Sequence, residues 1–109
     1  MTKLIKYFDN LNKILDAKER RDIINIYNIW VEEQPSIIDG DSRVGRPHHV
    51  RTANNSGTGM RPHDLWQVPI TNRQHQKQEQ THRAKYQVIF LDKLPELHDR
   101  FVDENNIII

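Results

Sequence analysis

The fold is decided by residues 47–82, which read PHHVRTANNSGTGMRPHDLWQVPITNRQHQKQEQTH. Residues 48–51 fit a short strand, and residues 65–70 (LWQVPI) fit a second one. The segment between them is rich in Gly, Asn and Pro, so it predicts a long surface loop. From Thr71 onward, a polar run without Gly or Pro predicts a solvent-facing helix. The resulting order of strand, loop, strand and helix is a ββα arrangement.

Helices are predicted on both sides of this segment. Apolar side chains recur at helical spacing between residues 3 and 15. Asp16 and Glu19 have the form of a capping box, which predicts a second helix that must end before Pro35. We expect Tyr27 and Trp30 of that helix to pack in the core.

Prolines and turn-forming residues predict the structure of residues 35–47 and of the C-terminal part. Residues 35–47 favour a turn or a short hairpin. Pro95 is expected in the first turn of a final helix, where a missing N–H is harmless.

The length of 109 residues limits the chain to one domain, and 36% hydrophobic side chains give it a modest core. The predicted helices and strands make the expected fold class α+β. We divide the chain into a helical segment at 1–34, a ββα core at 35–92, and a C-terminal helix and tail at 93–109. There is no cysteine, which excludes disulfides and cysteine-bound zinc. No apolar run is long enough for a membrane span or a signal peptide, so we expect no membrane partner and a cytoplasmic location.

The net charge of +1 hides an uneven distribution. Residues 40–86 carry eight Lys and Arg against three acids, and five of the six histidines lie in the same interval. A basic segment attracts phosphate groups, and clustered imidazoles can bind metal or move protons. The alternative is a polar loop region that collects charge only because it is solvated.

His48 and His49 are expected to have different roles, because successive side chains of a strand point to opposite faces. His75 and Glu79 are four residues apart on the predicted helix, which is the spacing of two ligands to one ion. His82 is a further seven residues beyond His75, too far along the axis to share that ion.

In these segments the chain resembles the HNH, or ββα-metal, endonucleases, and in particular the phage and prophage branch that includes the RecA-dependent Ref nuclease and related recombination proteins. The resemblance covers residues 34–92. It rests on residues 34–40 (QPSIIDG), 48–50 (HHV), 57–64 (GTGMRPHD) and 68–75 (VPITNRQH).

The resemblance implies a metal-dependent hydrolase acting on DNA phosphodiester bonds. It makes His49 the general base that deprotonates the attacking water, and it makes His48 and His75 metal ligands. The chemistry agrees with these residue types, because hydrolysis needs a base of near-neutral pKa and a cation that offsets the developing charge. Packing or capping roles for the histidines remain the alternative.

The chain departs from the family pattern at the positions of two expected metal sites, a structural zinc site and the catalytic metal site. Relatives often carry two cysteine pairs, where this chain has Ser36 with Asp39 and Thr71 with Gln74, so we expect no structural zinc. Glu79 stands where relatives tend to have a second helical His. A carboxylate there suits Mg²⁺ or Mn²⁺, and it equally fits a metal site that has decayed.

Two further sets of residues are assigned to the site. Asp64 either orients a histidine through its second ring nitrogen or caps a turn. A basic groove for the DNA backbone is predicted from five side chains, namely Arg46, Arg51, Arg61, Arg73 and Lys77.

Three functions are consistent with the sequence. The first is an active DNA endonuclease of phage origin, working in recombination or DNA processing in a bacterial cytoplasm. The second is a catalytically decayed HNH-fold module that binds DNA or a host recombination or defence protein. The third is a protein-interaction domain in which the histidines are incidental. The sequence carries no information on oligomeric state.

Overall fold

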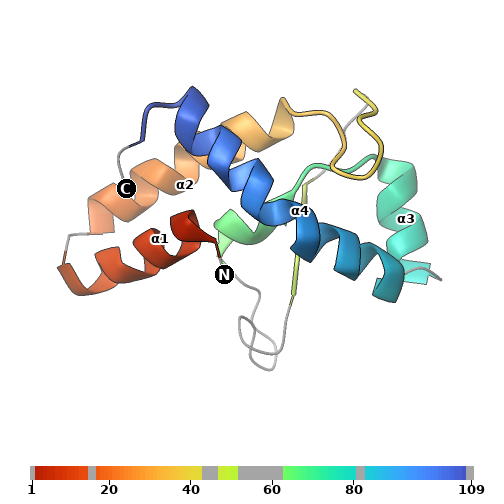
Figure 1. Ribbon diagram of the computed structural model, residues 1–109, viewed down its shortest axis with the longest axis horizontal. Coiled ribbons are helices and arrows are strands. Elements are labelled where there is room, and N and C mark those ends of the chain that lie inside the picture. Colours follow the sequence, from red (N-terminus) through yellow and green to blue (C-terminus); the bar gives the residue numbers. More distant parts are fainter. Residues whose placement is uncertain (1, 15–16, 43–46, 52–62, 81–82, 108–109) are drawn as a thin grey trace.

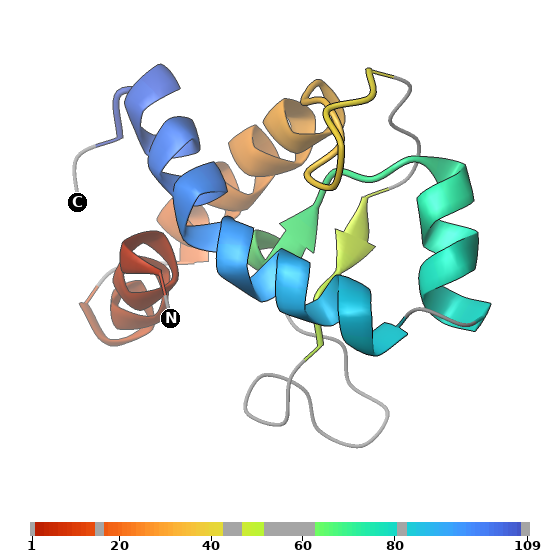
Figure 2. The ribbon, with the colours of Figure 1, turned by 45° about the vertical axis from the view of Figure 1, so that its right-hand side comes forward.

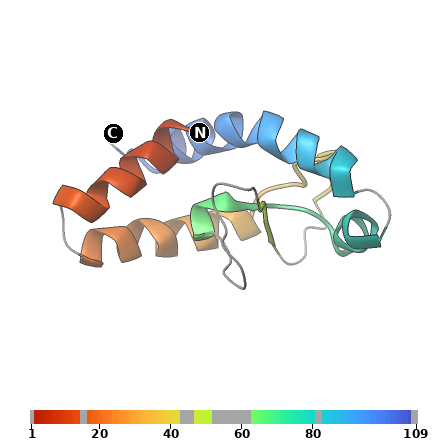
Figure 3. The ribbon, with the colours of Figure 1, turned by 90° about the horizontal axis from the view of Figure 1, so that it is seen from below.

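The computed structural model describes residues 2–14, 17–42, 47–51, 63–80 and 83–107, apart from the side chains of 9–14, 17 and 78–80. Helices α1 (Lys3–Ile14) and α4 (Arg83–Glu104) form one layer, and α2 (Ala17–Glu32) with the 3₁₀ helix η1 (Asp64–Trp66) lies in the other (Figures 1 and 3). Strands β1 (His48–His49) and β2 (Gln67–Val68) pair beside α3 (Asn72–Gln80) (Figure 2). The expected α+β class is confirmed as a helix-rich chain with a two-stranded antiparallel sheet.

The two N-terminal helices form where the apolar spacing predicts them. Thr2 caps α1 by accepting the N–H of Ile5 at 3.1 Å, and Phe8 continues the buried face. The second helix stops at Glu32, before Pro35, as predicted. The proposed cap at Asp16 lies outside the described residues.

The strand predicted at residues 65–70 is present only at Gln67 and Val68, and its first two residues form another element. Leu65 and Trp66 belong to η1, in which the N–H of Trp66 donates to the carbonyl of His63 at 3.0 Å. Both side chains are buried, and a strand would send neighbours to opposite faces, whereas a tight turn places both in the core. The strand pairing is correspondingly short, with His48 opposite Val68.

The helix predicted from Thr71 is present as α3, and Thr71 caps it. The N–H of Gln74 donates to the Thr71 hydroxyl at 3.1 Å, and the Gln74 amide oxygen accepts the Thr71 N–H at 2.9 Å. The helix is not wholly solvent-facing as predicted, because Gln74 is buried against residues that follow α2.

The prediction for Pro95 is also wrong, because Pro95 lies inside α4 and not in its first turn. The helix runs unbroken from Arg83 to Glu104 and crosses residues 92 and 93, where the sequence suggested a new segment (Figure 3). A proline ring costs the helix one hydrogen bond, and here it is exposed to solvent. Six buried side chains on the opposite stripe hold the helix together, namely Tyr86, Phe90, Leu94, Leu97, His98 and Phe101.

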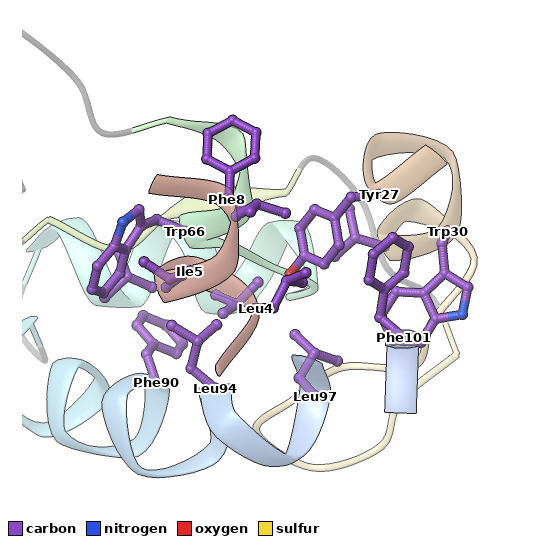
Figure 4. Packing of buried hydrophobic residues seen from close by; sticks show 14 of the residues in the cluster. Leu4, Ile5, Phe8, Tyr27, Trp30, Trp66, Phe90, Leu94, Leu97 and Phe101 are labelled. Atoms are coloured by element: carbon purple, nitrogen blue, oxygen red, sulfur yellow. The ribbon is translucent and has the colours of Figure 1, made fainter. Parts of the chain in front are cut away.

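The core lies between the two layers and reaches the strands. Tyr27 packs edge-on against Phe101 at 4.9 Å between ring centroids, next to Trp30 (Figure 4). Both aromatic residues of α2 are buried, as predicted. The Tyr27 hydroxyl donates to the carbonyl of Gln67 at 2.7 Å, and burial raises the pKa of Tyr27. This contact fixes β2 to α2. Within the described ranges, no helix combines the length and apolar character that crossing a bilayer takes.

His98 joins three elements inside this core. Its Nδ1 accepts the Thr2 hydroxyl at 2.7 Å, and its Nε2–H donates to the carbonyl of Leu65 at 2.7 Å. The side chain is 1% exposed, and burial lowers its pKa to about 4. Because Thr2 also caps α1, this one imidazole links α1, η1 and α4.

We expect acid to destabilise the fold partly through His98. The unfolded chain takes up a proton near pH 6.5 and the folded chain only near pH 4, so stability is lost as the pH falls through this window, by at most about 3 kcal/mol. Urea unfolding between pH 7.5 and 4 measures the loss. His98→Gln keeps one donor and one acceptor without a titrating group, so its stability should fall less steeply with acid. An unchanged pH dependence in this variant would contradict the role of His98.

Candidate active site

His48 projects from β1 towards α3 and α4. Its ring lies 5.2 Å from the ring of His75 on α3 and 5.3 Å from Phe90 on α4, measured between centroids. The His48 and His75 rings are nearly perpendicular, at 85°. Both histidines are half-buried. The structure therefore brings together two of the three side chains that the sequence assigned to a metal.

His48 is held in its neutral form. Burial, the neighbouring His75 and smaller contributions from His49, Arg83 and Arg51 together lower the pKa of His48 to about 4. A neutral imidazole has a free nitrogen lone pair, which is the form that binds metal ions. At neutral pH, His48 is thus ready to act as a ligand.

His49 faces the other side of the strand, as the alternation predicts. Its Nε2 lies 2.9 Å from Asp64 Oδ1 on η1 and 3.3 Å from the Gln67 amide nitrogen on β2. The second Asp64 oxygen accepts the side-chain N–H of Asn28 from α2 at 3.2 Å. Asp64 therefore has the histidine-orienting contact that the sequence left as one of two alternatives, and it also begins η1.

The hydrogen bonds at Asp64 decide which nitrogen of His49 is basic. Burial opposes ionisation of Asp64, but hydrogen bonds from His49, Asn28 and Gln67 together lower its pKa. Because an ionised carboxylate only accepts, the proton of the neutral His49 ring sits on Nε2. The lone pair is then on Nδ1, and His49 is 18% exposed at its side chain. This geometry suits a proton acceptor.

Sequence reasoning missed three residues of this site. Gln67 is the register partner of His49, so the correct pairing of the two predicted strands was the signal that could have found it. Asn28 reaches Asp64 only through the packing of α2, and its Oδ1 is buried with no partner among the described residues. Arg83, at the start of α4, acts electrostatically on His48 from 35 positions away in the sequence.

The third predicted metal ligand is not placed. Glu79 lies one turn beyond His75 in α3, but its side chain is outside the described residues. Among the side chains that are described, no group of three or more His, Cys, Asp and Glu is arranged to hold a metal ion. Among the described side chains, the donors that lie together are therefore the imidazoles of His48 and His75. Two neutral imidazoles fit a divalent ion whose other positions are filled by a carboxylate, water or substrate.

The basic residues near the histidines are open to solvent. Arg51, Arg73, Lys77 and Arg83 are all exposed, and in the part of the chain that the structure describes none of them forms an ion pair. Arg51 and Arg83 are close enough to His48 to lower its pKa. Arg46 and Arg61, which the sequence also assigned to DNA binding, lie outside the described residues.

Hydrogen bonds join the loop after α2 to the start of α3. The Ser36 hydroxyl donates to Gln74 Oε1 at 2.6 Å and accepts the N–H of Ile38 at 3.1 Å. Hydrogen bonds from the Asp41 N–H and the Gln74 side chain lower the pKa of Asp39. The cluster of Ser36, Asp39, Thr71 and Gln74 ties the loop after α2 to the first turn of α3, directly before His75. We call it the polar clasp.

A family model described as "Protein of unknown function (DUF968)" matches residues 12–104. The chain belongs to the DUF968 family. The match runs from α1 to the end of α4 and includes every residue of the candidate site. No curated protein and no solved structure matches the chain.

We expect the polar clasp to contribute to stability through Gln74. Gln74→Ala leaves the Ser36 hydroxyl and the Thr71 N–H without their acceptor in a buried place, which should cost about 1–3 kcal/mol. Gln76→Ala, an exposed position of the same helix, is the matched control and should change stability by less than about 0.5 kcal/mol. Urea unfolding of both variants measures the difference, and equal stabilities would show that the polar clasp does not contribute to the free energy of unfolding.

Proposed function

We propose that this chain is a metal-dependent endonuclease of the HNH type that hydrolyses DNA phosphodiester bonds. The observation that carries the proposal is the pair of imidazoles from His48 and His75, which a short antiparallel strand pair and the helix after it hold 5.2 Å apart. The order β1, β2, α3 agrees with the ββα-metal arrangement that the sequence resembles. The neutral state of His48 supports its use as a ligand.

In this proposal His48 and His75 hold a divalent ion, Mg²⁺ or Mn²⁺, with the Glu79 carboxylate as a third ligand. When bound, the ion supplies positive charge to the phosphate oxygens and to the departing 3′ oxygen. Two imidazoles alone give a weak site for such hard ions, and a carboxylate and the substrate phosphate supply the oxygen ligands that they prefer.

His49 is the proposed general base. Its Nδ1 takes a proton from water, the water oxygen attacks phosphorus, and the bond from phosphorus to the 3′ oxygen breaks. Asp64 acts as a positioning residue, because it accepts the Nε2–H and so keeps the lone pair on Nδ1. Gln67 supports Asp64 through a side-chain hydrogen bond. Asn28 in turn holds Asp64. The imidazolium that forms is stabilised by the ionised carboxylate beside it.

The DNA backbone would lie along the exposed basic side chains. Arg51 and Arg83 lie near enough to His48 to lower its pKa, and Arg73 and Lys77 extend the positive charge along α3. Contacts to phosphates position a strand without reading its sequence. Arg46 and Arg61 are proposed to extend the same surface. A phage or prophage recombination role and a bacterial cytoplasmic location follow from the resemblance alone.

The second candidate function is an HNH-fold module that binds DNA or a host protein without cleaving. It is favoured by the finding that the described side chains contain no group of three possible ligands. In that case the basic surface is kept, while Glu79 marks a metal site that has been lost. Metal affinity separates the two functions, because only the nuclease requires it.

We expect His49→Ala to reduce nicking of supercoiled plasmid by about 10²–10⁴-fold in Mn²⁺, because it removes the proton acceptor. Calorimetric titration should find its Mn²⁺ affinity nearly unchanged. His48→Ala and His75→Ala should lose both nicking and Mn²⁺ affinity, since each removes a ligand. Gln76→Ala, on the exposed side of α3, should retain both.

Two results would count against this assignment. Full nicking by His49→Ala would remove His49 from catalysis. A parent chain that binds DNA but neither binds Mn²⁺ nor nicks plasmid would favour the binding module.

We expect duplex DNA binding to weaken steeply with salt, with log affinity falling by about 0.9 per phosphate neutralised for each unit of log salt. Arg73→Ala should lower the affinity and reduce this slope by about 0.9, which corresponds to the loss of one phosphate contact. Arg100→Ala is the control, because Arg100 is engaged with Gln34 at 2.7 Å and with the Trp30 ring. Binding titrations at several salt concentrations measure the slopes. A flat response would exclude DNA as the partner.

A further inference from the structure

Helix α4 carries a second apolar stripe that the core does not use. Val88 is 68% exposed and Leu91 is 40% exposed. Ala84 and Pro95 are also exposed, and the four residues follow one another at intervals of four, three and four. This spacing keeps them on one side of the helix, and it is the spacing of the contact positions of paired helices. We call these four residues the α4 stripe.

The stripe lies to the side of the face by which α4 meets the rest of the molecule. The buried positions of the helix, such as Tyr86, Phe90 and Leu94, face α1, the strands and α3. Figures 1 and 2 show α4 running across one face of the molecule, with no other described element over it. Val88 and Leu91 are thus large apolar side chains exposed on an ordered helix.

Charges border the stripe on one side. Lys85 and Asp92 are both exposed and stand seven residues apart, which places them along the same edge about 10.5 Å from each other. In the part of the chain that the structure describes, neither forms an ion pair. The edge therefore carries a positive charge at one end and a negative charge at the other.

This arrangement is complementary to itself. We propose that the α4 stripe binds the α4 stripe of a second copy of this chain, with the two helices antiparallel. Centred between Val88 and Leu91, such a pair sets each Val88 against the partner's Leu91 and each Ala84 against the partner's Pro95. Reversing the helix direction also brings each Lys85 next to the partner's Asp92.

A second copy of the chain would cover the apolar stripe and pair the opposite charges at the two ends of its edge. An interface with twofold symmetry uses the same patch on both chains, so a patch with opposite charges at its two ends pairs with itself only in the antiparallel direction. A parallel twofold pair would place the charged edges of the two helices on opposite sides of the contact, so Lys85 and the partner's Asp92 would not meet. Four contact residues from each chain form a small interface, so we expect a weak dimer that depends on concentration.

The proposal does not rest on nuclease activity. Phe90 and His48 meet on the inner side of α4, so pairing through the stripe leaves the histidines uncovered. The dimer would hold two such sites, one on each side of the paired helices.

The test is sedimentation equilibrium of the full chain from about 10 μM to about 500 μM, a range suited to a small interface. The parent chain should pass from monomer to dimer across this range. Val88→Glu should weaken dimerisation at least about 30-fold, because it places two carboxylates in the apolar contact. Ile29→Glu on α2 is the matched control: Ile29 is 65% exposed, so the same substitution there should leave the dimer unchanged.

Charge exchange tests the antiparallel direction. Lys85→Asp or Asp92→Lys alone should weaken the dimer by about 3- to 10-fold, because two attractive pairs become repulsive. The double variant with both changes should restore the parent affinity. Circular dichroism confirms that each variant keeps its helices.

Three outcomes would overturn the proposal. They are a parent chain that stays monomeric at about 500 μM, well above the dissociation constant expected of a small interface; a dimer that Ile29→Glu weakens as much as Val88→Glu; and a double charge variant no tighter than either single one.

Discussion

The antiparallel pairing of β1 with β2 is the constraint on which the candidate site depends. The register sets His48 opposite Val68 and His49 opposite Gln67. Because neighbours on a strand point to opposite faces, this pairing sends His48 towards α3 and α4, and His49 towards η1 and α2. A slip by one residue would exchange the two surroundings. The register therefore gives two adjacent histidines different neighbours.

A strand pair of this length is not stable alone, and the helical core supports it. The Tyr27 hydroxyl holds the carbonyl of Gln67, and the His98 ring holds the carbonyl of Leu65 just before it. Val50 and Val68 are fully buried beside these contacts. The helices outside residues 35–92 are therefore part of what positions the histidines. An isolated ββα segment would lack these supports.

The parts of the fold that follow from local pattern could be predicted from the sequence. Periodic apolar residues located α1 and α2, and a run without Gly or Pro located α3. Local pattern failed where burial overrides propensity: η1 replaces a strand so that Leu65 and Trp66 share the core, and Pro95 is accommodated inside α4. Within the candidate site, strand alternation predicted separate surroundings for His48 and His49, and the contact of Asp64 with His49 was one of two alternatives that the sequence left open. Asn28 and Arg83 come from other elements, so only tertiary packing reveals them.

The charges around His48 suggest how a metal ion and a phosphate would depend on each other. Arg51, Arg83 and His75 all disfavour a positive charge on His48, which is why they lower its pKa. A bare divalent cation beside His48 would meet the same repulsion from the arginines. A phosphate group would bind these arginines and cancel that repulsion, so each ligand would favour the other. His49 has different electrostatic surroundings, because its own partner is the ionised Asp64. Strand alternation thus gives His48 surroundings that suit a cation with its phosphate, and it gives His49 surroundings that suit the acceptance of a proton.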